Sequence, residues 1–136
     1  MEGKVNNRDN RVVVTGIGVV SPLGLNLTTT WEGLAAGKSG IDYITLFDAE
    51  LLETKIAGEV KGFEPTDYIS RKDTRHMDRF AQLAVAASLQ ALEQSGLQIS
   101  FTNEDDIGIV IGSGIGGLTT LFEQNKILLE KGPERV

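Results

Sequence analysis

The sequence predicts an α/β fold, in which helices cover a largely buried β-sheet. Two apolar segments, residues 11–14 (RVVV) and 107–111 (IGIVI), are rich in β-branched residues, which is typical of strands covered on both faces. Helical patterns follow both segments. The resulting order of strand, helix, helix, strand and helix is typical of a layered α/β domain.

Three helices are predicted. Residues 26–36 carry an apolar face, and Gly37 stands where a helix would end. Residues 78–94 are apolar over more than half of the helix circumference, as in a helix buried between two layers. A third helix is predicted over residues 118–130, directly after a glycine-rich segment.

The remaining elements are short. A turn is expected at residues 21–24, a strand within residues 55–60, and a helical stretch near residues 67–70. Residues 38–48 and 102–106 have the composition of loops. The aromatic residues expected in the core are Trp31, Phe47, Phe63 and Phe80.

These elements do not account for a complete domain. A sheet of two strands is marginally stable, and a helix that is apolar on most of its surface needs a layer on each side. We therefore expect residues 1–10 to be a polar tail and residues 11–136 to be the N-terminal portion of a larger domain, incomplete at its C-terminal end.

Composition limits the chemistry available to the 136 residues. The net charge is -6, with 19 acidic and 13 basic side chains, which argues against nucleic acid or an anionic membrane as partner. There is no cysteine and one histidine, so these residues hold no thiol nucleophile and no multi-histidine metal site. No apolar run reaches the length of a membrane span, and the polar N-terminus lacks a secretory signal, so a cytoplasmic protein is expected.

Two glycine motifs imitate nucleotide-binding loops. Residues 33–39 (GLAAGKS) have three residues between their glycines where a P-loop has four, and they end a helix instead of opening one, so we reject that reading. Gly112-x-Gly114-x-x-Gly117 follows a predicted strand, as in dinucleotide-binding folds. The sequence lacks the second strand, ending in an acidic residue, that such folds need. We therefore favour another reason for the glycines, namely that they let the backbone pass close to a neighbouring part of the fold.

A basic segment lies before the second helix. If this segment is helical, Arg71, Arg75 and Arg79 form a row of like charges spaced four residues apart. In an acidic protein, this surplus indicates an anionic partner. The alternative is that the arginines pair with the neighbouring carboxylates of Asp73 and Asp78.

Five segments carry a shared pattern: residues 11–24, Trp31 with residues 34–41, residues 70–73, residues 77–80 and residues 112–117. Taken together and in order, these segments resemble β-ketoacyl-acyl-carrier-protein synthases of the type II, chain-elongating kind. The resemblance implies the thiolase fold, a five-layered αβαβα sandwich of which this chain supplies only the first part.

The resemblance also implies a function. The parent protein is expected to be an acyltransferase that elongates fatty acids by decarboxylative Claisen condensation of acyl and malonyl units on acyl carrier protein. It is expected to work as a homodimer, without a metal or other cofactor. The family uses a cysteine nucleophile and two histidines, none of which matches a residue of this chain, so the 136 residues alone are expected to be inactive.

Site residues follow from the resemblance position by position. Ile115, with Gly114, matches the family position that lines the acyl pocket and limits chain length. Lys72, Arg75 and Arg135 match basic residues that meet the acidic carrier protein.

Four other functions stay open at this point. The parent protein could be a non-catalytic partner resembling a chain-length factor, or a polyketide ketosynthase. The chain could also be a dinucleotide-binding module, or a truncated gene product without activity.

Overall fold

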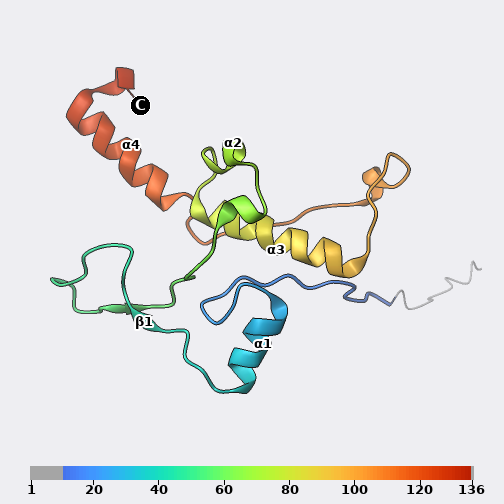
Figure 1. Ribbon diagram of the computed structural model, residues 1–136. Coiled ribbons are helices and arrows are strands. Elements are labelled where there is room, and N and C mark those ends of the chain that lie inside the picture. The colour runs from blue at the N-terminus through green and yellow to red at the C-terminus, as the bar shows by residue number, and fades with distance from the viewer. Residues whose placement is uncertain (1–10, 136) are drawn as a thin grey trace, which may run out of the picture.

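The computed structural model describes residues 11–135, and the tail predicted over residues 1–10 lies outside this range. Within residues 11–135 the regular structure consists of four α-helices, three 3₁₀ turns and one two-stranded sheet (Figure 1). None of these helices is both long and apolar enough to cross a membrane. The elements are α1 (Leu27–Ala35), β1 (Asp42–Tyr43), β2 (Ile56–Ala57), η1 (Pro65–Asp67), α2 (Arg71–Thr74), α3 (Arg79–Ser95), η2 (Glu104–Asp106), α4 (Leu118–Lys131) and η3 (Pro133–Arg135).

The three predicted helices are confirmed, because their ends are encoded locally. The Asn26 side chain caps α1 by accepting a hydrogen bond from Thr29 N at 2.9 Å. Gly37 and Gly96 follow α1 and α3 with φ angles of 65° and 66°, a conformation that favours glycine and stops a helix. The predicted turn is also confirmed, since Ser21 and Gly24 exchange two backbone hydrogen bonds.

The α3 helix packs against the segment that follows the first apolar run (Figure 1). A β-carbon at Gly16 or Gly18 would collide with backbone atoms of α3, so the two backbones are in close contact. Two glutamines on α3 fix this contact: Gln94 Oε1 accepts from Ile17 N at 2.6 Å, and Gln90 Oε1 accepts from Val19 N at 3.2 Å. This packing is possible because neither glycine has a side chain.

The two predicted strands are wrong for this structure. Residues 11–14 and 107–111 belong to no sheet among residues 11–135, and Val12 and Val110 are 97% and 99% exposed. A strand exists only when a neighbouring backbone pairs with it, and no other described segment pairs with either of these. The β-branched residues are present, but the part of the chain that the structure describes supplies no backbone to pair with them.

The only sheet within residues 11–135 is a small antiparallel hairpin. It pairs Asp42 with Ala57 and Tyr43 with Ile56. The strand expected within residues 55–60 is therefore confirmed in part, while the loop expected over residues 38–48 contains β1. Of the helical stretch expected near residues 67–70, only Asp67 is helical, at the end of η1, because residues 68–70 form a bend before α2. The acidic loop contains η2.

The core is small for a chain of this mass. The accessible surface is 11610 Å², whereas a compact folded monomer of 14.7 kDa exposes about 6,900 Å². Phe63 is buried, as predicted, but Trp31, Phe47 and Phe80 are exposed by 40% or more, so their assignment to the core is wrong. Their apolar faces have no opposing layer among the described residues. The same holds for much of α3, in which Ala86 is the one fully buried residue.

Candidate functional site

The basic segment before α3 is broken into two helices. Ser70 caps α2 by accepting from Asp73 N at 3.2 Å, and α2 ends at Thr74. Asp78 then adopts an extended backbone, with φ -65° and ψ 159°, and starts α3. The continuous row of like charges predicted from Arg71 to Arg79 is therefore wrong, because the helix that would align these residues is interrupted.

Arg79 is separated from the other arginines by its contacts. Its guanidinium donates to the carbonyl oxygens of Val60 at 3.2 Å and Phe63 at 3.4 Å. It also lies 4.8 Å from the centre of the Phe63 ring, within the range of a cation–π interaction. Arg79 thus ties the start of α3 to the segment before η1.

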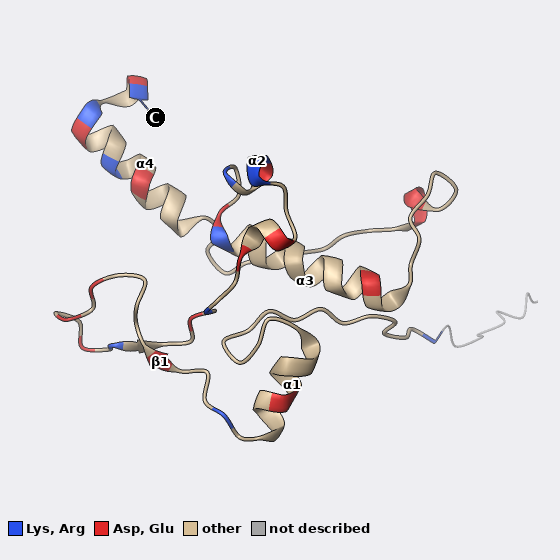
Figure 2. Ribbon diagram, in the orientation of Figure 1, with Lys and Arg blue, Asp and Glu red and all other residues tan. Residues whose placement is uncertain are grey.

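The other three cations of this segment form no ion pair with another residue of the range 11–135. Among the described residues, no carboxylate lies within 4.0 Å of Arg71, Lys72 or Arg75. The two carboxylates proposed as partners are engaged elsewhere: Asp73 accepts from the Ser70 hydroxyl at 2.7 Å, and Asp78 accepts from Thr120. Internal pairing is therefore contradicted. The side chains of Arg71, Lys72 and Arg75 are exposed, and we call these three residues the basic patch. Figure 2 colours Lys and Arg positions blue along the ribbon, including those of α2.

The glycine-rich segment before α4 forms an exposed loop. Gly116 has a φ of 82°, and its N–H donates to the Ser113 hydroxyl at 3.1 Å, which closes the loop around Ile115. Ile115 is 77% exposed. We call residues 113–117 the glycine loop.

The expected close approach at these glycines is confirmed at one position. A β-carbon at Gly117 would collide with the Asp78 carboxylate, whereas Gly112 and Gly114 have no atom within 4 Å of such a carbon. The strand that a dinucleotide fold needs before the loop is missing among residues 11–135.

Asp78 joins the basic segment to the glycine loop. Its Oδ1 accepts from Thr120 Oγ1 at 2.5 Å, and its Oδ2 occupies the space beside Gly117. Two hollows meet at this carboxylate. One, of about 440 Å³, is mainly polar, and its lining includes Arg75, His76, Thr120 and Glu123. The other, of about 270 Å³, is lined in part by the apolar side chains of Phe80, Leu83 and Leu118.

The structure brings together some of the predicted site residues and separates another. Arg75 and the glycine loop lie on either side of Asp78. Arg135 lies in η3, beyond the other end of α4, and a helix of 14 residues is about 21 Å long. Figure 1 shows α4 extending away from the junction with α3. Arg135 is therefore not part of the basic patch in this chain.

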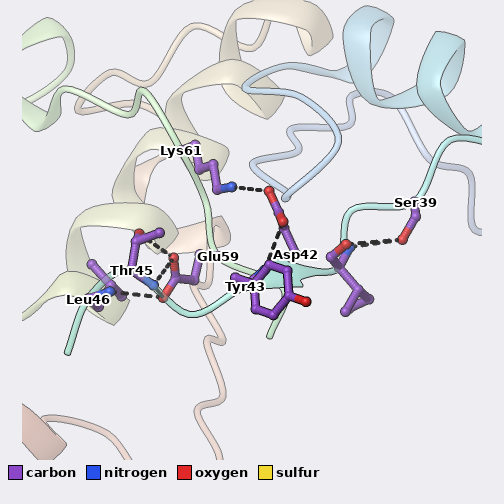
Figure 3. Close-up of polar contacts among 8 residues, drawn as sticks. Ser39, Asp42, Tyr43, Thr45, Leu46, Glu59 and Lys61 are labelled. Atoms are coloured by element: carbon purple, nitrogen blue, oxygen red, sulfur yellow. Dashed lines mark hydrogen bonds and ion pairs between the residues drawn. The ribbon is translucent and has the colours of Figure 1, made fainter. Parts of the chain in front are cut away.

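A second polar cluster anchors the β1–β2 hairpin (Figure 3). Lys61 Nζ lies 2.6 Å from Asp42 Oδ2, and the hydrogen bond from Lys61 holds the pKa of Asp42 below its ordinary value. Glu59 accepts hydrogen bonds from the hydroxyl and N–H of Thr45 and from Leu46 N, and the Thr45 bonds lower the pKa of Glu59. The contacts of Asp42 and Glu59 therefore stabilise the β1–β2 hairpin.

The sequence did not lead us to predict the polar contacts that join α3, α4 and the β1–β2 hairpin to neighbouring segments. Gln90 and Gln94 lie four positions apart on a helix that is apolar over more than half of its circumference, a pattern that could have indicated a polar contact with a neighbouring segment. Asp78 and the partners of Glu59 gave no such indication, because their contacts join residues distant in sequence. Within residues 11–135 no three His, Asp or Glu side chains converge as ligands for a metal ion.

Comparisons with known proteins agree over nearly the whole chain. The family model "Beta-ketoacyl synthase, N-terminal domain" matches residues 9–135. The protein named 3-oxoacyl-[acyl-carrier-protein] synthase 2 from Synechocystis sp. is 48% identical over 130 residues, which cover 96% of this chain and 31% of the relative. The protein of the same name from Vibrio cholerae is 49% identical over 126 residues, covering 93% of this chain and 30% of the relative. The chain thus spans just under a third of the length of these relatives.

A solved structure supports the same relationship. A chain of the ishigamide ketosynthase/chain length factor matches with a TM-score of 0.71 and 36% sequence identity. The match covers 91% of this chain and 31% of that one. The described helices and loops therefore have the arrangement found in part of a complete ketosynthase-type chain.

Proposed function

Because the chain belongs to the β-ketoacyl synthase family, whose N-terminal domain it matches, we propose that the full-length protein elongates acyl chains on acyl carrier protein. The family match and the structural match confirm the predicted α/β fold class of the ketosynthases. The single observation that carries the functional proposal is the identity of 45–49% over 93–96% of the chain to proteins named 3-oxoacyl-[acyl-carrier-protein] synthase 2.

The proposed reaction is a decarboxylative Claisen condensation. An acyl group is held as a thioester, the malonyl unit loses CO₂, and the carbanion so formed attacks the thioester carbonyl carbon. A carbon–carbon bond forms, the carbon–sulfur bond breaks, and the thiol is released. Since this chain contains no cysteine, the proposed thiol nucleophile would come from another part of the full-length protein.

Within this scheme the chain contributes to carrier docking. The carrier protein is acidic, and Lys72 and Arg75 are exposed cations without an internal carboxylate partner in the described part of the chain. Such charges attract an oppositely charged partner and orient it as it approaches. Arg135 lies at the opposite end of α4 from Lys72 and Arg75, so it would contact the carrier protein at a separate position.

The glycine loop contributes to the acyl pocket. Ile115 projects from a loop in which Gly114 and Gly116 have no side chains, so other parts of the protein have room to pack around it. A β-branched side chain has few rotamers and makes a well-defined wall. We assign Ile115 and Gly114 to the lining of the acyl pocket, beside the interface of a homodimer.

The test is an elongation assay with the full-length protein, an acyl-carrier-protein primer and malonyl-carrier protein. We expect a β-ketoacyl product two carbons longer than the primer, with one CO₂ released for each condensation. The matched control is the polypeptide of residues 1–136, which has no thiol to accept the acyl group. Failure of the full-length protein to form the product with any primer would refute the proposal.

A second candidate is favoured by the name of the structural relative, which pairs a ketosynthase with a chain length factor. In that case the full-length protein would lack acyl transfer of its own and would bind a separate, active ketosynthase. Acyl labelling of the full-length protein distinguishes the two, because a chain-length-factor-like partner accepts no acyl group. A polyketide ketosynthase would be distinguished by repeated extension without reduction.

A further inference from the structure

The Asp78 side chain serves a helix other than the one it begins. Asp78 is the N-cap residue of α3, yet its side chain makes no capping hydrogen bond there. It turns instead to α4, where it accepts from Thr120 Oγ1 at 2.5 Å. Thr120 is the third residue of α4, in the turn where backbone N–H groups lack partners within the helix.

The α4 helix lacks its own means of stabilising that end. Its N-cap is Gly117, which has no side chain, and its first turn contains no acidic residue. The N-terminus of a helix carries partial positive charge, so a carboxylate beside it is favourable. Asp78 therefore supplies from α3 the negative charge that α4 does not encode locally.

The same carboxylate explains the glycine at position 117. The space that a β-carbon would need there is filled by Asp78 Oδ2. Gly117 is joined through Gly116 to Ile115, and the hydrogen bond from Gly116 N to the Ser113 hydroxyl limits the freedom of the residues between. A displacement of Asp78 would therefore be transmitted to Ile115 within two residues.

We propose that Asp78 is a positioning residue, which fixes the glycine loop against the start of α3 and thereby sets the place of Ile115. The effect on acyl chain length rests on the proposed function, whereas the contact itself does not. Asp78 lies three residues after Arg75, so the segment that carries the basic patch also holds the loop.

The test is a double-mutant cycle in the full-length protein, with thermal stability as the first measurement. Gly117→Ala should destabilise the protein, because the new methyl group collides with the carboxylate. In the Asp78→Ala background the collision is relieved, so the combined loss should be smaller than the sum of the single losses by about 2 °C or more. Additive losses would overturn the inference.

A second measurement tests the position of Ile115. The ratio of rates with long and short acyl primers should change about threefold or more in Asp78→Asn and in Thr120→Val, both of which keep the side-chain shape. The control is Asp67→Asn, which removes an exposed carboxylate without a hydrogen bond in the structure and should leave the ratio unchanged. A uniform fall in rate for every primer would mean that Asp78 acts on stability alone and would overturn the positioning role.

The two measurements separate this inference from the proposed function. If the full-length protein condenses no primer, the proposed function fails, and the stability cycle still decides whether Asp78 holds the glycine loop. If condensation occurs but the cycle is additive, the proposed function stands and the positioning role fails.

Discussion

Replacing Gly18 by alanine should destabilise the protein strongly, because there is no space for the added methyl group. Its β-carbon would collide with the carbonyl oxygen of Ala87 and lie 2.9 Å from Ala91 N, where ordinary contact begins near 3.4 Å. These are backbone atoms of α3 and cannot rotate away, so the segment has to retreat by about 0.5 Å or more. The hydrogen bond from Val19 N to Gln90 Oε1, already 3.2 Å long, would then exceed the usual limit.

The expected magnitude combines two effects. Overpacking a fitted contact costs about 1–3 kcal/mol, and the loss of a hydrogen bond costs about 0.5–1.5 kcal/mol. Together they predict that Gly18→Ala lowers the free energy of unfolding by about 3 kcal/mol. Denaturant-induced unfolding of the full-length protein measures this loss as a lower midpoint with an unchanged slope.

A matched control adds a side chain to an exposed glycine. Gly37 has open space around it, and asparagine tolerates its positive φ, so Gly37→Asn should change the stability by only a few tenths of a kcal/mol. If Gly18→Ala is as stable as this control, the segment does not pack against α3 as described.

Four further predictions concern the proposed site and the charged clusters. Ile115→Phe in the full-length protein should shorten the longest acyl chain accepted, because each excluded methylene forfeits about 0.8 kcal/mol of burial; rates with short and long primers measure this. Lys72→Glu combined with Arg75→Glu should weaken carrier-protein binding at low salt, and the loss should shrink at high salt as the charges are screened. The polypeptide of residues 1–136 should self-associate and bind an apolar dye, since its surface is far larger than that of a compact monomer. The pKa values of Asp42 and Glu59 are lowered in the folded state, so the stability that these carboxylates contribute should be present at neutral pH and be lost as the pH falls below about 4. The difference in stability between the protein and its Asp42→Asn or Glu59→Gln variant should therefore disappear on acidification.

Each of these predictions has a result that would contradict it. A uniform loss of rate for all primers would make Ile115 an ordinary packing residue. Carrier binding that is unaffected by the double charge reversal would remove Lys72 and Arg75 from the docking surface. A monomer with a sharp thermal transition would contradict self-association, and a stability difference that does not shrink on acidification would contradict the carboxylate assignments.

The helices were predictable because the residues that define them are close in sequence. Asn26 and Gly37 mark both ends of α1, and Gly96 ends α3. The strands could not be predicted in the same way. The valines of residues 11–14 favour a sheet, but their identity does not indicate which backbone segment pairs with them.

The candidate site was predictable in composition but not in geometry. The basic residues and the glycines were recognisable in the sequence, but the contact of Asp78 with Thr120 and Gly117, which connects them, was not. An aspartate before a helix usually caps that helix, and only the three-dimensional structure shows that this one reaches α4 instead.

The exposed valines of residues 11–14 have a consequence for biosynthesis. A ribosome adds about 5–20 residues per second, so in a protein of the relatives' length this part of the chain emerges tens of seconds before synthesis ends. In this part of the chain Val12 and its neighbours are exposed and apolar, which is the kind of segment that chaperones bind. The rate of translation and the supply of chaperones should therefore affect how much of the protein reaches its folded state.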